Sequence, residues 1–253
     1  MPSFNIEDYI NSLPEDIESI DVSGKFLTYL PSLKRFHKLK KLDCSDNQLT
    51  NLPELNHSLE WLVCFNNKLT SLPKLNDNLE RLNCDENKLT SLPQLNKNLR
   101  FLYCYGNQLT SLPQLNNSLK ILHCSNNQLT RLPKLNYSLQ YLDCNHNKLI
   151  CLPELNNNLQ YLYCLINLLP SFIPTTNGIL IQGTRNRINN AFQLYRFKLL
   201  FWSLKYKQKF RDWLWIRVRL PKIEKMYHPS KLNELLYSSD MNDEELDNVI
   251  GTW

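Results

Sequence analysis

The sequence predicts a solenoid in which short parallel β-strands stack into one curved sheet, because a 20-residue pattern repeats along most of its 253 residues. Cysteine recurs every 20 residues from Cys44 to Cys164, and asparagine recurs three residues later, from Asn47 to Asn167. Around them leucines form the pattern L-x-x-L-x-C-x-x-N-x-L-x-x-L-P-x-L-N, as in residues 79–96. A fixed period of this length indicates units that bury a core only by stacking on one another.

This is the pattern of a leucine-rich repeat in which cysteine replaces the usual leucine at the sixth position of each unit. Alternation in residues 82–84 predicts a short strand with Leu82 and Cys84 facing inward and Asn83 facing outward. The asparagine at the ninth position is expected to satisfy backbone groups where the chain turns away from the sheet, and stacked copies predict a ladder.

The remaining part of each unit is too short for a long helix. About nine residues follow Leu89 before the next unit, and Pro93 favours an extended backbone. We therefore predict a polyproline-like convex side with at most single-turn helical segments.

The chain is expected to contain four parts. Residues 1–16 form an N-terminal cap, residues 17–190 the solenoid, residues 191–231 a basic aromatic helical segment and residues 232–253 an acidic tail. The solenoid has about nine units, of which seven are regular at 39–178. A last, degenerate unit is predicted from the residues Ile181, Gly183, Asn186 and Ile188, with Asn186 following Asn167 by 19.

The motif L-P-E-L-N-x-S-L-E-x-L-x-C-x-x-N-x-L-T-S-L-P resembles the 20-residue repeat class of secreted bacterial effector proteins. Its cysteine-bearing, asparagine-rich version is also similar to leucine-rich-repeat proteins of giant DNA viruses of amoebae, the mimivirus-like group. The residues R-L-P, Y-H-P and L within 219–232 resemble C-terminal segments of such viral proteins. These resemblances imply a curved interaction scaffold, without implying a particular partner.

Seven of the eight cysteines occupy one inward position, so we interpret them as buried, reduced thiols that act as small hydrophobes. Neighbouring rungs about 4.8 Å apart would allow a disulfide by distance, but parallel Cβ vectors make its torsion awkward. There is no Cys-x-x-Cys motif, so no metal site is expected. Cys151 lies outside this row of seven sixth-position cysteines, and we expect it to be the most exposed thiol.

Outward side chains at the third, fifth and seventh positions define the concave face of the sheet, called the strand face below. Aromatic residues are frequent there, and they are over-represented at interface anchors because they bury large rigid areas at low entropic cost. Lateral packing between neighbouring rungs is the alternative interpretation, favoured for the third-position rings, whereas binding is favoured for Phe65, Tyr103 and Tyr105. The predicted partner-binding residues are Trp61, Phe65, Phe101, Tyr103, Tyr105, Tyr141 and Tyr163.

The segment after the repeats is strongly basic. Residues 185–231 contain 13 Lys and Arg against two acids, and residues 232–253 contain six acids and no Lys or Arg. A helical cap over the last rung is the favoured interpretation. The alternatives are an adaptor that binds nucleic acid through basic residues among Trp202, Trp213 and Trp215, or one that lies on a membrane surface.

No enzyme is predicted. The sequence lacks a phosphate-binding glycine loop, a Gly-x-Ser-x-Gly elbow and a His-Glu-x-x-His motif, and its five histidines are scattered. Some effectors of the resembled class carry a C-terminal ubiquitin ligase with a catalytic cysteine, but no cysteine follows Cys164 here. No cofactor and no small-molecule substrate are expected.

We predict an intracellular, cytoplasmic location, which would be the host cytoplasm for a viral protein. Residues 1–10 include Glu7 and Asp8 and no continuous apolar run, so no secretory signal is expected. No stretch approaches the roughly 20 apolar residues of a membrane-spanning helix. The sequence thus predicts a non-enzymatic scaffold that binds a protein on the strand face.

Overall fold

The computed structural model describes residues 4–169, the backbone of 177–179, and the separate residues 185, 186, 188–190, 207, 208, 212 and 215. The chain divides into two compact units, Met1–Gln193 and Leu194–Trp253. The predicted helical segment 191–231 and the acidic tail 232–253 lie outside the described residues, apart from the few single positions just given.

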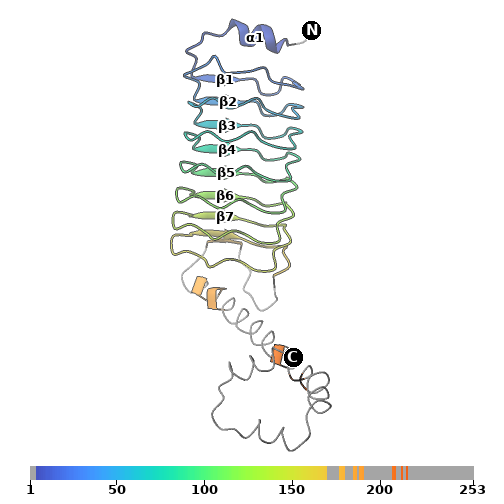
Figure 1. Cartoon of the computed structure of the whole chain (residues 1–253), viewed down its shortest axis with the longest axis vertical. Coiled ribbons are helices and arrows are strands. Elements are labelled where there is room, and N and C mark those ends of the chain that lie inside the picture. Colours follow the sequence, from blue (N-terminus) through green and yellow to red (C-terminus); the bar gives the residue numbers. More distant parts are fainter. Residues whose placement is uncertain are drawn as a thin grey trace, which may run out of the picture. The chain divides into compact units, whose positions relative to one another are not determined.

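Within the described residues, nine three-residue strands form one sheet in sequence order, stacked as rungs (Figure 1). Strands β1 to β8 pair in parallel, and residues at the same repeat position are direct partners, as Leu82 and Leu102 are. This arrangement confirms the leucine-rich-repeat solenoid. The strands are β1 (Ser19–Asp21), β2 (Lys41–Asp43), β3 (Trp61–Val63), β4 (Arg81–Asn83), β5 (Phe101–Tyr103), β6 (Ile121–His123), β7 (Tyr141–Asp143), β8 (Tyr161–Tyr163) and β9 (Asn177–Ile179).

A short helix precedes the first strand. Helix α1 (Ile6–Ser12) begins after Asn5, whose side chain accepts hydrogen bonds from the backbone of the first turn, and it buries Ile6 and Ile10. Arg35 donates to the carbonyl oxygens of Ile10 and Leu13, which ties α1 to the connection between β1 and β2. The helix thus covers apolar surface that the first rung would otherwise expose.

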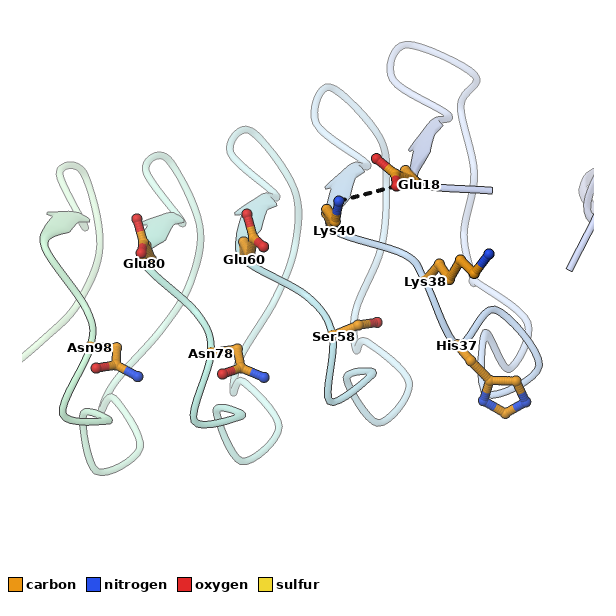
Figure 2. Close-up of a pocket in the computed structure, with 9 residues that line it drawn as sticks. All are labelled: Glu18, His37, Lys38, Lys40, Ser58, Glu60, Asn78, Glu80 and Asn98. Atoms are coloured by element: carbon orange, nitrogen blue, oxygen red, sulfur yellow. Dashed lines mark hydrogen bonds and ion pairs between the residues drawn. The ribbon is translucent and has the colours of Figure 1, made fainter. Parts of the chain in front are cut away.

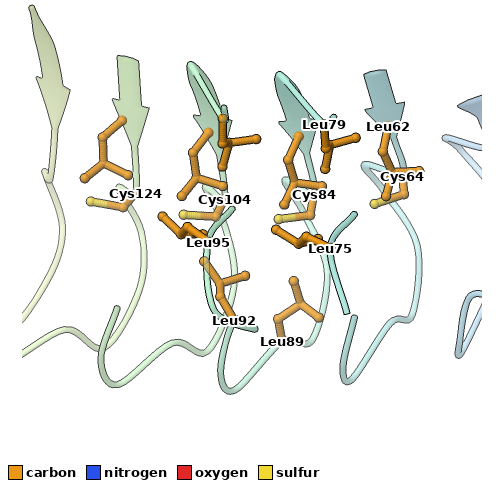
Figure 3. Packing of buried hydrophobic residues seen from close by; sticks show 14 of the residues in the cluster. Leu62, Cys64, Leu75, Leu79, Cys84, Leu89, Leu92, Leu95, Cys104 and Cys124 are labelled. Atoms are coloured by element: carbon orange, nitrogen blue, oxygen red, sulfur yellow. The ribbon is translucent and has the colours of Figure 1, made fainter. Parts of the chain in front are cut away.

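The core is a column of leucines with the cysteine row running through it (Figure 3). Leu62, Leu82 and Leu102 are inaccessible to solvent, and so are the cysteines two residues after each of them. All eight cysteines are free thiols, and only Cys151 is less than fully buried. The predicted burial of the cysteine row and the greater exposure of Cys151 are confirmed.

The ninth-position asparagines form the predicted ladder. Asn87 Nδ2 donates to the carbonyl oxygens of Cys64, Cys84 and Asp85, and its Oδ1 accepts from the backbone N–H of Leu69 at 3.0 Å. The same set of bonds recurs from Asn67 to Asn147. Each asparagine therefore joins its own turn to the preceding rung.

A second asparagine ladder runs along the other end of each unit, at the eighteenth position. Asn96 Nδ2 donates to the carbonyl oxygen of Asn76 and, at 2.9 Å, to that of Leu79. Its Oδ1 accepts from the N–H of Leu99 at 2.7 Å. These bonds fix the turn that leads into each strand, and the sequence interpretation had given this asparagine no role.

The last strand of the sheet differs from the prediction. Strand β9 pairs antiparallel with β8, with Tyr163 opposite Asn177, instead of continuing the parallel stack. Thirteen residues separate β8 from β9, against 17 between regular rungs, so this connection is four residues shorter than a repeat circuit. The strand after β8 therefore does not continue the parallel stack, and the ladder role of Asn186 in a degenerate last unit stays a prediction.

Residues 185–190 instead close the end of the core. Ile188 is fully buried, and Arg185 donates to the carbonyl oxygen of Leu159. Asn189 exchanges two hydrogen bonds with the backbone of Leu155, at 3.0 and 3.2 Å. No helix among the described residues is long and apolar enough to cross a membrane.

Candidate functional site

The strand face is built by the residues that flank the buried leucine of each strand. In every strand from β2 to β8 the central leucine is buried and both neighbours are partly or fully accessible. Trp61 and Tyr161 are the most accessible rings on this face, at 37% and 39% exposure. Phe65, Phe101 and Tyr105 are half-buried.

Cations lie between the rings at the third position of the first rungs. Lys41 Nζ is 4.2 Å from the ring centroid of Trp61, and the Arg81 guanidinium is 5.7 Å from it on the next rung. Arg81 also lies 5.2 Å from the ring of Tyr103 and 6.0 Å from that of Phe101. These contacts hold each ring at a fixed orientation through cation–π attraction.

His123 is at the centre of the face. Its ring stacks on Tyr105 at 5.4 Å and meets Tyr103 edge-on at 6.4 Å. Its Nε2 lies 2.8 Å from Ser125 Oγ and 3.3 Å from Asp143 Oδ2. Burial alone would lower the pKa of His123, but the hydrogen bond and charge of Asp143 raise it above its usual value.

Asp85 is the other unusual group on this face. Burial raises its pKa from 3.8 to about 6, against the opposing effects of a hydrogen bond from the Tyr105 N–H at 2.6 Å and the nearby His123. No Lys or Arg forms an ion pair with Asp85 in the part of the chain that the structure describes. This carboxylate has therefore lost water without gaining a cationic partner.

A tyrosine cluster ends the face. Tyr141 lies 6.1 Å from Tyr161 and 5.4 Å from Tyr163, with tilted rings in both pairs. Burial and the charge of Asp143 raise the pKa of Tyr141, so its hydroxyl stays protonated at neutral pH.

The seven predicted binding residues all lie on this face, yet they form two groups and not one cluster. Lateral packing, predicted for the third-position rings, also engages Tyr103 and Tyr105 at the fifth and seventh positions. Phe65 has no ring or cation contact of this kind among the described residues. Sequence reasoning missed the roles of Arg81, His123 and Asp85.

The flank where the chain enters the strands holds an open, charged depression of about 520 Å³ (Figure 2). Glu60 and Glu80 stand on successive rungs, and Glu18 pairs with Lys40 at 3.1 Å. Sites for small organic ligands are mostly apolar, and this depression is lined mainly by charged and amide side chains. Its composition is that of a solvated surface. The lining residues are Glu18, His37, Lys38, Lys40, Ser58, Glu60, Asn78, Glu80 and Asn98.

The cysteine row offers no reactive group to this face. Burial raises the pKa of the Cys84 and Cys104 thiols well above the usual value. Cys84 Sγ instead donates weakly to the carbonyl oxygen of Tyr103 on the next rung, at 3.3 Å. No group of three or more His, Cys, Asp or Glu side chains in the described ranges could hold a metal ion.

Comparison with known proteins identifies the class. The family described as Leucine Rich repeats (2 copies) matches residues 97–137. A leucine-rich-repeat domain of a Shigella effector is 34% identical, with a TM-score of 0.56, over 65% of this chain and 74% of that domain. The chain therefore belongs to the leucine-rich-repeat proteins, whose fold is typically a scaffold for protein–protein interaction and generally not enzymatic.

Two solved structures of YopM from Yersinia are also similar. YopM from Y. enterocolitica WA-314 is 34% identical over 62% of this chain, with a TM-score of 0.51, and YopM from Y. pestis is 31% identical over 61%, with a TM-score of 0.54. The chain spans 39% and 51% of the lengths of these two proteins. No curated protein sequence matches the chain significantly.

Proposed function

We propose that this protein is a non-enzymatic scaffold that binds a protein partner on its strand face. The observation that carries the proposal is the set of aromatic side chains on β3, β5, β7 and β8, most of which contact a cation or another ring on a neighbouring rung. Trp61, Tyr103 and Tyr105 each contact a cation or an imidazole on a neighbouring rung. Rings ordered before binding lose little conformational entropy when a partner covers them.

The similar proteins support a role in binding other proteins, without identifying the partner or the binding residues. The similar Shigella and Yersinia proteins are described as effectors, and repeat proteins use their extended surfaces to bind other macromolecules. Together with the resemblance to giant-virus repeat proteins, this supports a location in the cytoplasm of a host cell. The partner-binding residues proposed are the seven aromatic side chains predicted from the sequence.

Affinity capture from lysate of the natural cell tests the proposal. The double variant Tyr103→Ala/Tyr105→Ala should lose a specific partner that the wild type and Tyr137→Ala both retain. Tyr137 is a matched control because it is 78% exposed and lies off the strands. Thermal melts must first show that all three proteins are folded, and a partner retained by the double variant overturns the assignment.

The alternative, an adaptor that binds nucleic acid or a membrane through residues 191–231, rests on the basic composition of that segment alone. Salt dependence distinguishes it from the scaffold. Binding to phosphate groups weakens by orders of magnitude between about 50 and 200 mM salt, whereas binding through the aromatic strand face should change by only a few-fold.

A further inference from the structure

The charged side chains of the strand face are segregated across the width of the sheet. The fifth, seventh and eighth positions from β1 to β8 carry six acids and no Lys or Arg. We name these six acids the acidic band. Its members are Asp21, Asp43, Asp46, Asp85, Glu86 and Asp143.

The cations of the sheet lie on its opposite side, at the second and third positions, where Glu18, Glu60 and Glu80 also lie. Two of them, Lys41 and Arg81, are already engaged with the rings of Trp61 and Tyr103. No member of the acidic band forms an ion pair with a Lys or Arg within the described residues, and His123 beside Asp143 is the one basic group in such contact. Lys25 acts on Asp21 by its charge, and His123 acts on Asp85 as well as on Asp143, so among the described residues the other members of the band are the ones without such compensation.

Acids and rings alternate along this side of the face. Seven consecutive rungs present, at either their fifth or their seventh position, a carboxylate, a ring, a carboxylate, a ring, an imidazole, a carboxylate and a ring. Neighbouring rungs are about 4.8 Å apart, so each carboxylate lies one rung from an aromatic or imidazole side chain. The residues in order are Asp43, Phe65, Asp85, Tyr105, His123, Asp143 and Tyr163.

The protein's own side chains show what this spacing accommodates. Lys41 on β2 places its ammonium group 4.2 Å from the ring centroid of Trp61 on β3, and Arg81 on β4 reaches Tyr103 on β5. A Lys or Arg can thus cover a ring one rung away from its own position. On the acidic side of the face the rings and carboxylates are present, but the matching cations are missing.

We propose that the strand face binds a lysine- and arginine-rich segment of its protein partner, whose cationic groups reach the acidic band while their aliphatic stems cover Phe65 and Tyr105. This inference rests on the proposed function and adds the chemistry of the partner. Asp85 supplies the strongest contact, because its carboxylate is already largely desolvated and a cation would restore the charge compensation that water no longer gives. Arg and Lys stems bury well on aromatic surfaces while their charged ends stay polar.

Fluorescence polarisation of the full chain with a labelled 12-residue peptide of alternating Arg and Gly tests the inference. The protein has a net charge of +5, so non-specific attraction works against this peptide and binding must come from a local acidic region. The acidic band and the tail 232–253 are the two such regions, and the charge variants below distinguish them. The peptide should bind, and the same peptide with Glu in place of Arg should not. Equal affinity for the two peptides overturns the inference.

Charge variants locate the binding surface. The double variant Asp43→Asn/Asp85→Asn should lower the affinity for the Arg peptide about tenfold, because each lost contact with a charged group is worth roughly a factor of two to five in affinity. Glu60→Gln/Glu80→Gln removes the same charge from the flank outside the strand face and should change affinity less than about twofold. An equal loss in both variants would mean that only overall charge matters, and the inference would be wrong.

Affinity capture of the natural partner distinguishes a failure of this inference from a failure of the proposed scaffold function. If Tyr103→Ala/Tyr105→Ala loses the natural partner while Asp43→Asn/Asp85→Asn keeps it fully, the strand face is the binding site but the partner segment is not basic. If both variants keep the partner, both proposals fail. Loss in both variants, with each protein folded, supports the two together.

Discussion

Removing one residue of the first asparagine ladder should measurably destabilise the solenoid. In Asn87→Ala the buried N–H of Leu69 loses its bond to Asn87 Oδ1, and no other partner replaces it. An unsatisfied buried donor costs about 1–3 kcal/mol. The three carbonyl oxygens that Asn87 also serves each keep a second donor, so their loss adds less. Those donors are Asn67 for Cys64, Asn107 for Cys84 and the N–H of Asn66 for Asp85.

The expected total is therefore a loss of about 2–4 kcal/mol in the free energy of unfolding, or roughly 5–12 °C in melting temperature. Asn87→Asp should be worse than Asn87→Ala at pH 7, because it places an acceptor-only carboxylate against three carbonyl oxygens. Near pH 4 this difference should shrink, since a protonated carboxyl can donate one hydrogen bond.

Urea unfolding followed by circular dichroism measures these differences. Asn51→Ala is the control, because Asn51 is exposed and has no side-chain hydrogen bond among the described residues. It should stay within about 0.5 kcal/mol of the wild type. Asn87→Ala within the same margin, or Asn87→Asp as stable as Asn87→Ala at pH 7, would refute the account of the ladder.

Three further outcomes are expected. Asp85→Asn should stabilise the fold by about 1–2 kcal/mol at pH 7, discounted for the partial exposure of the carboxylate. Burial raises the pKa of the Asp85 carboxyl from 3.8 to about 6 in the folded protein. The protonated carboxyl therefore contributes its full stabilisation below pH 3.8, and this stabilisation is lost as the pH rises through 6. The gain should thus disappear near pH 4, as measured by urea unfolding at both pH values. A thiol reagent should label the native protein once, at Cys151, and the remaining cysteines only after unfolding. Gly106→Ala should cost about 1–2 kcal/mol, because the φ of +65° disfavours a side chain and a Cβ would lie 3.1 Å from the carboxyl group of Glu86.

Each of these has a control. Asp77→Asn removes an exposed carboxylate and should show no such pH dependence; a matching gain would contradict the burial of Asp85 as the cause. Cys151→Ser should abolish native labelling, and residual labelling would mean that the buried row is accessible. Gly24→Ala has the same left-handed φ with open space around it, so a larger loss there than at Gly106 would contradict the contact with Glu86.

The period of the sequence was sufficient to predict the sheet and its register. Because Leu82 and Leu102 occupy the same repeat position, any stacked solenoid must make them strand partners. The second ladder was not predicted, since an asparagine such as Asn96 also fits an ordinary turn. Its role depends on the path of the preceding circuit, which brings the carbonyl of Asn76 within reach.

The end of the array shows where periodicity misleads. The spacing of 19 between Asn167 and Asn186 resembles one more unit, but the strand that follows β8 runs antiparallel to it. Spacing alone cannot distinguish a shortened parallel rung from a strand that reverses direction.

The sequence predicted only part of the candidate site. The rings were visible as outward positions, but single residues were considered without their neighbours 20 residues away. Applying the register to the third and fifth positions brings Arg81 beside Trp61 and Phe101, and Tyr103 beside His123. The raised pKa of Asp85 could not be predicted in this way, because it depends on how deeply neighbouring side chains bury the carboxylate.

Site-specific photo-crosslinking tests the central claim most directly. A benzophenone amino acid replaces Tyr105 on the strand face or Tyr137 off the strands, and the folded proteins are irradiated in lysate of the natural cell. The account predicts one covalent adduct of defined mass from position 105 and none from position 137. An adduct from position 137 alone, or the same adducts from both, would contradict a binding site on the strand face.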